Sequence, residues 1–292
     1  MTTRAFDKAP ATGPMLLKAV LPALPVVGSI PGIRHDGTTS PDLVLDRSGI
    51  TTDPKHLAAY NAVCGYDAAD HVPPLYPHMG AFALHMALMT DTSFPFLPMG
   101  VVHVRNSVTQ HRPIGVDEAF DITVKASPLR AHKVGRVLDL VTTAHISGEV
   151  VWEETSTLLS RGKPFDGPRD SSPLAGIDAP EGVVQWKLAG NLGRRYGAVS
   201  GDRNPIHLYP ITAKAFGFPR NIAHGMWSKA RSLAQLQNRL PKAYTVDVEF
   251  KRPILLPSTV IFGSRVHDAV TTFGVTSARK PETHLLGQIT PA

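Results

Sequence analysis

The stretch that decides the fold is residues 196–227, which read YGAVSGDRNPIHLYPITAKAFGFPRNIAHGMW. It contains two expected helix starts within about thirty residues. Asn204 followed by Pro205 predicts the first, because Asn is a favoured N-cap and Pro fits the first helical position. Ser200 and Gly201 allow a sharp bend just before it. The stretch therefore predicts a tight loop that leads into a helix near Pro205.

Asp202 and His207 are predicted to face each other at this first helix start. Asp202 lies just before the cap and His207 lies in the first turn. The positive end of a helix favours an ionised Asp202 and a neutral His207. A carboxylate and a neutral imidazole can hold one water molecule between them and move its protons, as the addition of water to a double bond requires. Which of the two is the base stays open at this stage.

Gly225 marks the second expected helix start. The apolar residues that follow, Met226, Ala230, Leu233 and Ala234, are spaced to share one face of a helix. Because glycine has no Cβ, a substrate carbonyl can approach the backbone N–H groups there, and the helix dipole stabilises charge on its oxygen. Polarisation of a thioester carbonyl would make the β-carbon of an enoyl group electrophilic, which complements the poised water.

These residues resemble the hydratase 2 motif of the MaoC-like (R)-specific enoyl-CoA hydratases and 3-hydroxyacyl-thioester dehydratases. In that family an SGDxNPxH segment is followed by an HGM segment, and here residues 200–207 and 224–226 fit both. The resemblance implies a hydro-lyase of fatty acid metabolism with a hot-dog fold. It also implies reversible hydration of trans-2-enoyl thioesters to (R)-3-hydroxyacyl thioesters. We expect no metal, because no other spacing of His or acidic residues is typical of a metal site, and no cofactor, because the sequence has no Gly-rich phosphate loop.

The resemblance also implies residue roles. Asp202 and His207 would be the acid/base pair, Asn204 would orient the substrate or the water, and the Gly225 N–H would form the oxyanion hole. Ser200 belongs to the same motif and joins Asn204 and Gly225 as an expected substrate-binding residue. His224 is expected to be structural and to bond the backbone of the loop.

Internal echoes predict two copies of one domain. Tyr60–Gly65 (YNAVCG) echoes Tyr196–Gly201 (YGAVSG), and Arg112-Pro113-Ile114 echoes Arg252-Pro253-Ile254, at offsets of 136 and 140 residues. The apolar run Ala81–Met89 stands where the helix after Gly225 stands. After Gly65 the first copy has neither an Asn-Pro cap nor a His in the place of His207, so we expect it to be degenerate.

The predicted fold class is α+β, a double hot-dog in which each curved antiparallel sheet wraps a central helix. Alternating patterns predict strands at Tyr244–Phe250, Phe120–Lys125, Val137–Ile146 and Glu149–Leu159. We expect a degenerate domain over 1–161, a linker rich in Pro, Gly, Asp and Ser over 162–181, and the catalytic domain over 182–292. The apolar stretch Met15–Val27 is expected to be extended chain or an early strand.

Composition limits the partners. The 292 residues are 42% apolar with a net charge of +6, as in an ordered protein that favours anionic partners. Among anionic partners, the resemblance implies an acyl-CoA or acyl-carrier-protein thioester as substrate. We expect no nucleic acid, because the sequence has no basic run interleaved with aromatic residues. We expect no membrane span, because the apolar stretch Met15–Val27 is too short. We also expect a possible homodimer. One cysteine excludes an internal disulfide framework and fits a reducing, cytoplasmic compartment.

Two rival functions stay open. A hot-dog acyl thioesterase would act on the same thioesters but release a free thiol. A non-catalytic acyl-binding partner subunit would hold acyl groups without turnover, and the intact Asp202 and His207 argue against it.

Overall fold

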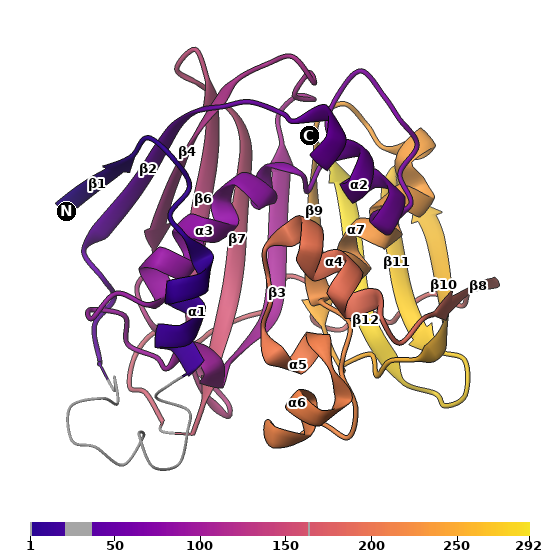
Figure 1. Ribbon diagram of the computed structural model, residues 1–292. Helices are drawn as coiled ribbons and strands as arrows, with labels where there is room; N and C mark the ends of the chain where they lie inside the picture. Colours follow the sequence, from indigo (N-terminus) through magenta and orange to yellow (C-terminus); the bar gives the residue numbers. More distant parts are fainter. Residues whose placement is uncertain (1, 21–36, 163) are drawn as a thin grey trace. The chain divides into compact units, whose positions relative to one another are not determined.

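The computed structural model describes residues 2–20, 37–162 and 164–292 and has an α+β fold (Figure 1). Its helices are α1 (Thr12–Val20), α2 (Pro54–Cys64), α3 (Pro77–Met89), α4 (Leu192–Ser200), α5 (Pro205–Leu208), α6 (Pro210–Ala215) and α7 (Gly225–Leu236), with 3-10 turns η3 (Pro98–Gly100) and η4 (Gln237–Arg239). Its strands are β1 (Thr2–Phe6), β2 (Leu43–Ile50), β3 (Val101–Gln110), β4 (Phe120–Ala126), β5 (Arg130–His132), β6 (Gly135–Ile146), β7 (Glu149–Arg161), β8 (Val184–Leu188), β9 (Tyr244–Phe250), β10 (Ser258–His267), β11 (Val270–Ser277) and β12 (Thr283–Pro291). Among these described residues, no helix is long and apolar enough to cross a membrane.

The chain forms two compact units that are not continuous in sequence. Unit 1 comprises the described residues of Met1–Thr51, His78–Asn106 and Ala119–Ser172, and unit 2 comprises Thr52–Pro77, Ser107–Glu118 and Pro173–Ala292. Helix α2, from the first half of the sequence, thus belongs to the same unit as α4 to α7. The division into 1–161, a linker over 162–181 and 182–292 stays a prediction.

Unit 1 is a sheet with helix α3 packed against it. The strand order is β1-β2-β4-β6-β7, followed by residues 101–106 of β3, and β5 pairs with β6. Strand β1 runs parallel to β2, whereas the pairs β2–β4, β4–β6 and β6–β7 are antiparallel. Helix α3 is held by His78, whose Nδ1 lies 2.8 Å from Glu154 Oε2 on β7, and by His85, whose Nε2 lies 2.7 Å from Thr142 Oγ1 on β6. The strands expected around 120–125, 137–146 and 149–159 are confirmed.

Unit 2 repeats this plan and carries the motif. Its antiparallel strands follow the order β9-β12-β11-β10-β8, and the expected strand Tyr244–Phe250 is β9. Buried Lys229 on α7 donates from Nζ to the Val246 carbonyl of β9 at 3.0 Å. Helix α2 is tied to its neighbours by His56 Nε2, 2.7 Å from the Val199 carbonyl, and by the Trp227 indole N–H, which donates to the Val63 carbonyl at 2.9 Å.

The sequence echo at Gly65 and Gly201 corresponds to a repeated helix end. Helix α2 ends at Gly65 with φ 81° and α4 ends at Gly201 with φ 76°, and each glycine N–H donates to a carbonyl of the last helical turn. A left-handed residue at this position strongly favours glycine. The two copies therefore share a helix that stops at the same point of the motif, which agrees with the double hot-dog expectation.

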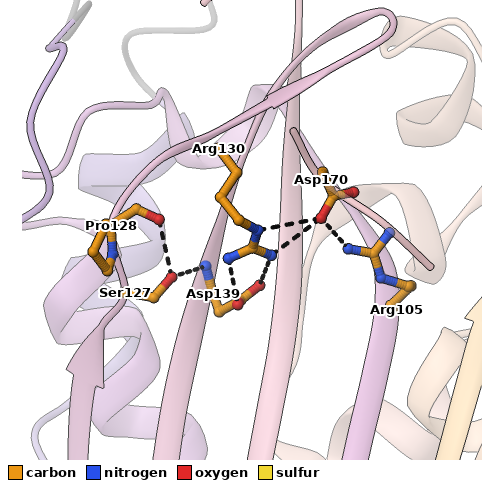
Figure 2. A network of polar contacts seen from close by, with 6 residues as sticks. All are labelled: Arg105, Ser127, Pro128, Arg130, Asp139 and Asp170. Carbon is orange, nitrogen blue, oxygen red and sulfur yellow. Dashed lines mark hydrogen bonds and ion pairs between the residues drawn. The ribbon is translucent and has the colours of Figure 1, made fainter. Parts of the chain in front are cut away.

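The first half of the predicted linker is anchored within unit 1 by Asp170, as Figure 2 shows. The carboxylate of Asp170 accepts hydrogen bonds from Arg105 and Arg130. Arg130 also makes a bidentate ion pair with Asp139, in which its Nη1 and Nη2 donate to the two carboxylate oxygens at 2.7 and 2.9 Å. Burial alone would raise the pKa of Asp170, but the hydrogen bonds and charges of the two arginines outweigh it and lower that pKa. Asp170 is therefore ionised and fixed, although its segment has the composition of a flexible loop.

The expectation for Met15–Val27 was wrong in its first part. Residues 15–20 lie in helix α1 (Thr12–Val20), where the one proline, Pro14, is in the first turn and is therefore tolerated. Residues 21–27 lie outside the described residues.

Candidate active site

The loop before α5 forms as its sequence predicts. Asn204 is the N-cap, its side-chain oxygen accepts the Ile206 N–H at 3.3 Å, and Pro205 occupies the first helical position. Helix α5 is a single turn of four residues, so its dipole is small and the expected electrostatic effect of a helix start on Asp202 and His207 is reduced. The state of His207 must therefore have another cause.

Asp202, His207 and His224 converge within unit 2. One ligand-type atom of each lies within 4.8 Å of the other two. The Asp202 carboxylate is held by its Oδ1, which accepts the Asn204 N–H at 3.0 Å, and its side chain is 30% exposed. Its Oδ2 lies 3.7 Å from His224 Nε2. The predicted pairing of Asp202 with His207 is therefore present in the fold, with one carboxylate oxygen fixed by the backbone.

His207 is buried and neutral. Its Nδ1 lies 2.9 Å from the Ile222 carbonyl, and since a carbonyl can only accept, Nδ1 carries the proton and Nε2 keeps its lone pair. Burial lowers the pKa of His207, and the charge of Asp202 and the bond to Ile222 offset this only in part. Burial thus supplies the neutral imidazole that the sequence argument assigned to a helix dipole.

His224 contacts both Asp202 and His207. Its Nε2–H donates to the Asp202 carbonyl at 3.0 Å, which confirms the expected bond to the loop backbone. Its ring also stacks on the His207 ring with centroids 3.7 Å apart and an angle of 25°. Burial and the neighbouring His207 lower the pKa of His224 to about 3, so the stacked pair stays uncharged near neutral pH.

Two glycines of α4 allow this loop to approach the helix. A Cβ on Gly193 would lie 1.9 Å from the His207 carbonyl oxygen, and a Cβ on Gly197 would lie 2.7 Å from the Asp202 carbonyl oxygen. Sequence reasoning missed these positions, although glycines four residues apart on one helix face are a recognisable sign of close packing. It also missed Asn221, whose buried side chain donates to the carbonyls of Gly190 and His207.

The remaining motif residues take the following places. Gly225 is the first residue of α7, where backbone N–H groups have no partner within the helix, and a Cβ there would lie 3.0 Å from the Phe250 ring. The Ser200 hydroxyl accepts the Asp202 N–H at 3.2 Å. The roles of Gly225, Ser200 and Asn204 toward a substrate stay predictions.

In the described part of the chain, two side-chain groups have the composition of metal-binding sites. One is Asp202 with His207 and His224, and the other is buried His78 with His85 and Glu154 in unit 1. Burial would raise the pKa of Glu154, but His78 and His85 lower it to about 2, and burial lowers the pKa of His85 to about 3. The unit 1 group is therefore a carboxylate whose hydrogen bonds come from His78 and Asn106, which is a satisfied buried network.

Comparison with known proteins gives consistent results. The model of the MaoC like domain matches residues 179–285. The 3-hydroxyacyl-thioester dehydratase X (HtdX) of Mycobacterium tuberculosis is 39% identical over 250 residues, which cover 84% of this chain and 85% of that protein. A crystal structure of HtdX superposes with a TM-score of 0.75 and 34% identity, covering 85% of this chain and 100% of that one.

A further relative and a further structure of similar fold are from the same organism. The enoyl-CoA hydratase ChsH3 is 28% identical over 167 residues, 54% of this chain and 58% of that protein. A protein solved as a double hot-dog fold superposes with a TM-score of 0.56 at 14% identity, covering 87% of this chain and 96% of that one, and supports the fold alone.

The repeated sheet-and-helix plan and the paired carboxylate and imidazole define a double hot-dog protein of the hydratase and dehydratase class. Within that class the chain belongs to the MaoC-like dehydratase family, since it is 39% identical to HtdX over most of both chains.

Proposed function

We propose that the protein is a hydro-lyase of fatty acid metabolism that interconverts trans-2-enoyl thioesters and (R)-3-hydroxyacyl thioesters. The observation that carries the proposal is that the Asp202 carboxylate lies beside a neutral His207. The Nδ1–H of His207 bonds the backbone, so its Nε2 carries a lone pair that can accept a proton. The names of the relatives, a 3-hydroxyacyl-thioester dehydratase and an enoyl-CoA hydratase, support the same reaction.

In the hydration direction Asp202 acts as general base on a water that His207 helps to position. Asp202 Oδ1 already accepts the Asn204 N–H, so Oδ2 is the oxygen that takes the proton. The water oxygen bonds to the β-carbon as Asp202 Oδ2 takes that proton. The proton then passes from Oδ2 to the Nε2 lone pair of His207 and from Nε2 to the α-carbon. Both side chains return to their starting protonation states, so dehydration follows the same steps in reverse.

The start of α7 supplies the complementary polarisation. Gly225 is its first residue, and its N–H would donate to the thioester oxygen, where negative charge develops as water adds. His224, the N-cap of α7, also bonds the Asp202 carbonyl, so one residue connects the base to the oxyanion donor. Asn204 and Ser200 keep the loop in shape and are proposed to contact the substrate.

The experiment follows the conjugated absorbance of an enoyl thioester with and without a thiol reagent. A hydratase removes the absorbance without releasing thiol and yields the (R)-3-hydroxyacyl product. Release of free thiol would instead indicate the thioesterase rival. No change of either signal, with acyl binding retained, would indicate the non-catalytic partner subunit.

Two finer proposals concern the setting. We place the enzyme in the cytoplasm, supported by its single, buried and unpaired Cys64. A homodimer is proposed as the assembly, to be tested by light scattering.

A further inference from the structure

The segment that carries Asp202 and His207 also carries a cluster of exposed cations. Residues 192–220 contain Arg194, Arg195, Arg203, Lys214 and Arg220 against one carboxylate, Asp202. All five cations are exposed, and none of them forms an ion pair with any residue in the described part of the chain. The segment spans α4, α5 and α6, the orange elements of Figure 1. Its charge is therefore available to an external anionic partner.

Exposed apolar side chains lie among these cations. Tyr209 is 50% exposed and Ile211 is 79% exposed, which makes Ile211 one of the most exposed large apolar residues of the described chain. The Arg194 guanidinium lies 4.8 Å from the centre of the Tyr209 ring and donates to the Leu208 carbonyl. Lys214 follows Ile211 by three residues on α6, so the two are neighbours on the helix surface. We call Arg194, Tyr209, Ile211 and Lys214 the α6 patch.

We propose that the α6 patch is a docking surface for an acidic acyl carrier protein that presents the acyl group as a thioester. The inference rests on the proposed function and adds the identity of the carrier. Arginine and tyrosine are enriched at protein interfaces, and exposed cations beside exposed apolar side chains, here Arg194 and Lys214, complement an acidic partner surface. Because Tyr209 and Ile211 follow His207 within four residues, a carrier bound there sits beside the loop that holds the acid/base pair.

The apolar residues favour a protein over free coenzyme A. Arg194 already covers one face of the Tyr209 ring, which limits stacking of a nucleotide base there. Ile211 has no planar surface, and a phosphate gains nothing from an exposed aliphatic side chain. An aliphatic contact is useful to a partner that buries a continuous surface.

The test compares three carriers of one enoyl group: an uncharged N-acetylcysteamine thioester, the coenzyme A thioester and the thioester of an acidic acyl carrier protein. The variant I211S/K214E removes the apolar contact and reverses one charge of the patch. The variant V266S/R265E makes the same kinds of change at exposed residues of β10 and serves as the matched control. Binding of the carrier protein is measured separately by fluorescence anisotropy.

With the carrier-protein substrate, we expect I211S/K214E to lower kcat/KM by roughly 10-fold or more, through slower association. The same variant should keep wild-type kcat/KM with the uncharged thioester, and the control variant should match wild type on all three. Three results would each overturn the proposal. The first is an unchanged kcat/KM of I211S/K214E with the carrier-protein thioester, and the second is an equal loss with the coenzyme A thioester. The third is a wild-type enzyme that does not act on the carrier-protein thioester.

Failure of the proposed function gives a different result. If the protein hydrates no thioester, wild type will also be inactive on the uncharged N-acetylcysteamine thioester. The anisotropy measurement of carrier-protein binding still tests the α6 patch in that case. Carrier binding that I211S/K214E leaves unchanged would then contradict the docking surface independently of turnover.

Discussion

Gly193 in α4 is the position where one added methyl group should disturb the site most. A Cβ there would lie 1.9 Å from the His207 carbonyl oxygen, whereas a relaxed contact needs about 3.5 Å. Either α4 or the His207 segment must therefore move by more than about 1 Å, a displacement that can cost about 100-fold in rate. We expect Gly193→Ala to lower kcat/KM by roughly 100-fold and the free energy of unfolding by about 1–3 kcal/mol.

Two further glycines calibrate the effect. A Cβ on Gly197 would lie 2.7 Å from the Asp202 carbonyl oxygen, so Gly197→Ala should have an intermediate effect. A Cβ on Gly190 would lie 3.7 Å from Pro257 Cδ, an ordinary contact, so Gly190→Ala is the matched control. Initial hydration rates and urea midpoints are measured for all three variants. A Gly193→Ala enzyme with wild-type kcat/KM would refute the reasoning that α4 sets the position of His207.

The remaining predictions concern pH, the helix cap and the linker. His85 and His224 have pKa values lowered to about 3, so between about pH 6.5 and 3 the unfolded chain binds more protons than the folded one. The free energy of unfolding should therefore fall by about 1.4 kcal/mol for each unit of falling pH and each of the two histidines. This dependence on pH should be weaker in His85→Gln. Urea midpoints that stay constant down to about pH 5 would contradict the prediction. Asn204→Ala should lose about 1 kcal/mol of stability and part of the activity, and Asn204→Ser, which can still cap, should recover the stability in thermal unfolding. Asp170→Asn should lower the free energy of unfolding in urea by about 2 kcal/mol, because two arginines lose the carboxylate that they share. Asp166→Asn, at an exposed position, should leave that free energy unchanged. Equal urea midpoints for the two variants would show that the contacts of Asp170 contribute no stability.

Local features of the site could be predicted from the sequence because they depend on neighbouring residues. Asn204 with Pro205 fixes the start of α5, Gly225 begins α7, and the alternating residues 244–250 form β9. The backbone bond of His224 also followed from its place in the motif. Capping and period-two patterns act over a few residues, so one sequence is enough to read them.

Features that depend on distant parts of the chain could not be predicted in this way. Nothing in residues 54–64 indicates that α2 packs in the unit of the catalytic motif. The neutrality of His207 comes from its burial, whereas the sequence pattern attributed it to the dipole of a helix that is only one turn long. The residues on either side of Asp170 in the sequence have the composition of a linker. The two arginines that bind its carboxylate lie 40 and 65 residues away in the sequence, so the local pattern does not indicate them.

The central claim is that Asp202 is the base of a hydration reaction, and Asp202→Asn tests it most directly. The amide oxygen can still accept the Asn204 N–H, and the site is partly exposed, so folding should be nearly unchanged. Loss of the conjugated enoyl thioester absorbance should slow by about 10²- to 10⁴-fold in the variant, with an unchanged urea midpoint. Wild-type turnover by a folded Asp202→Asn enzyme would contradict the claim.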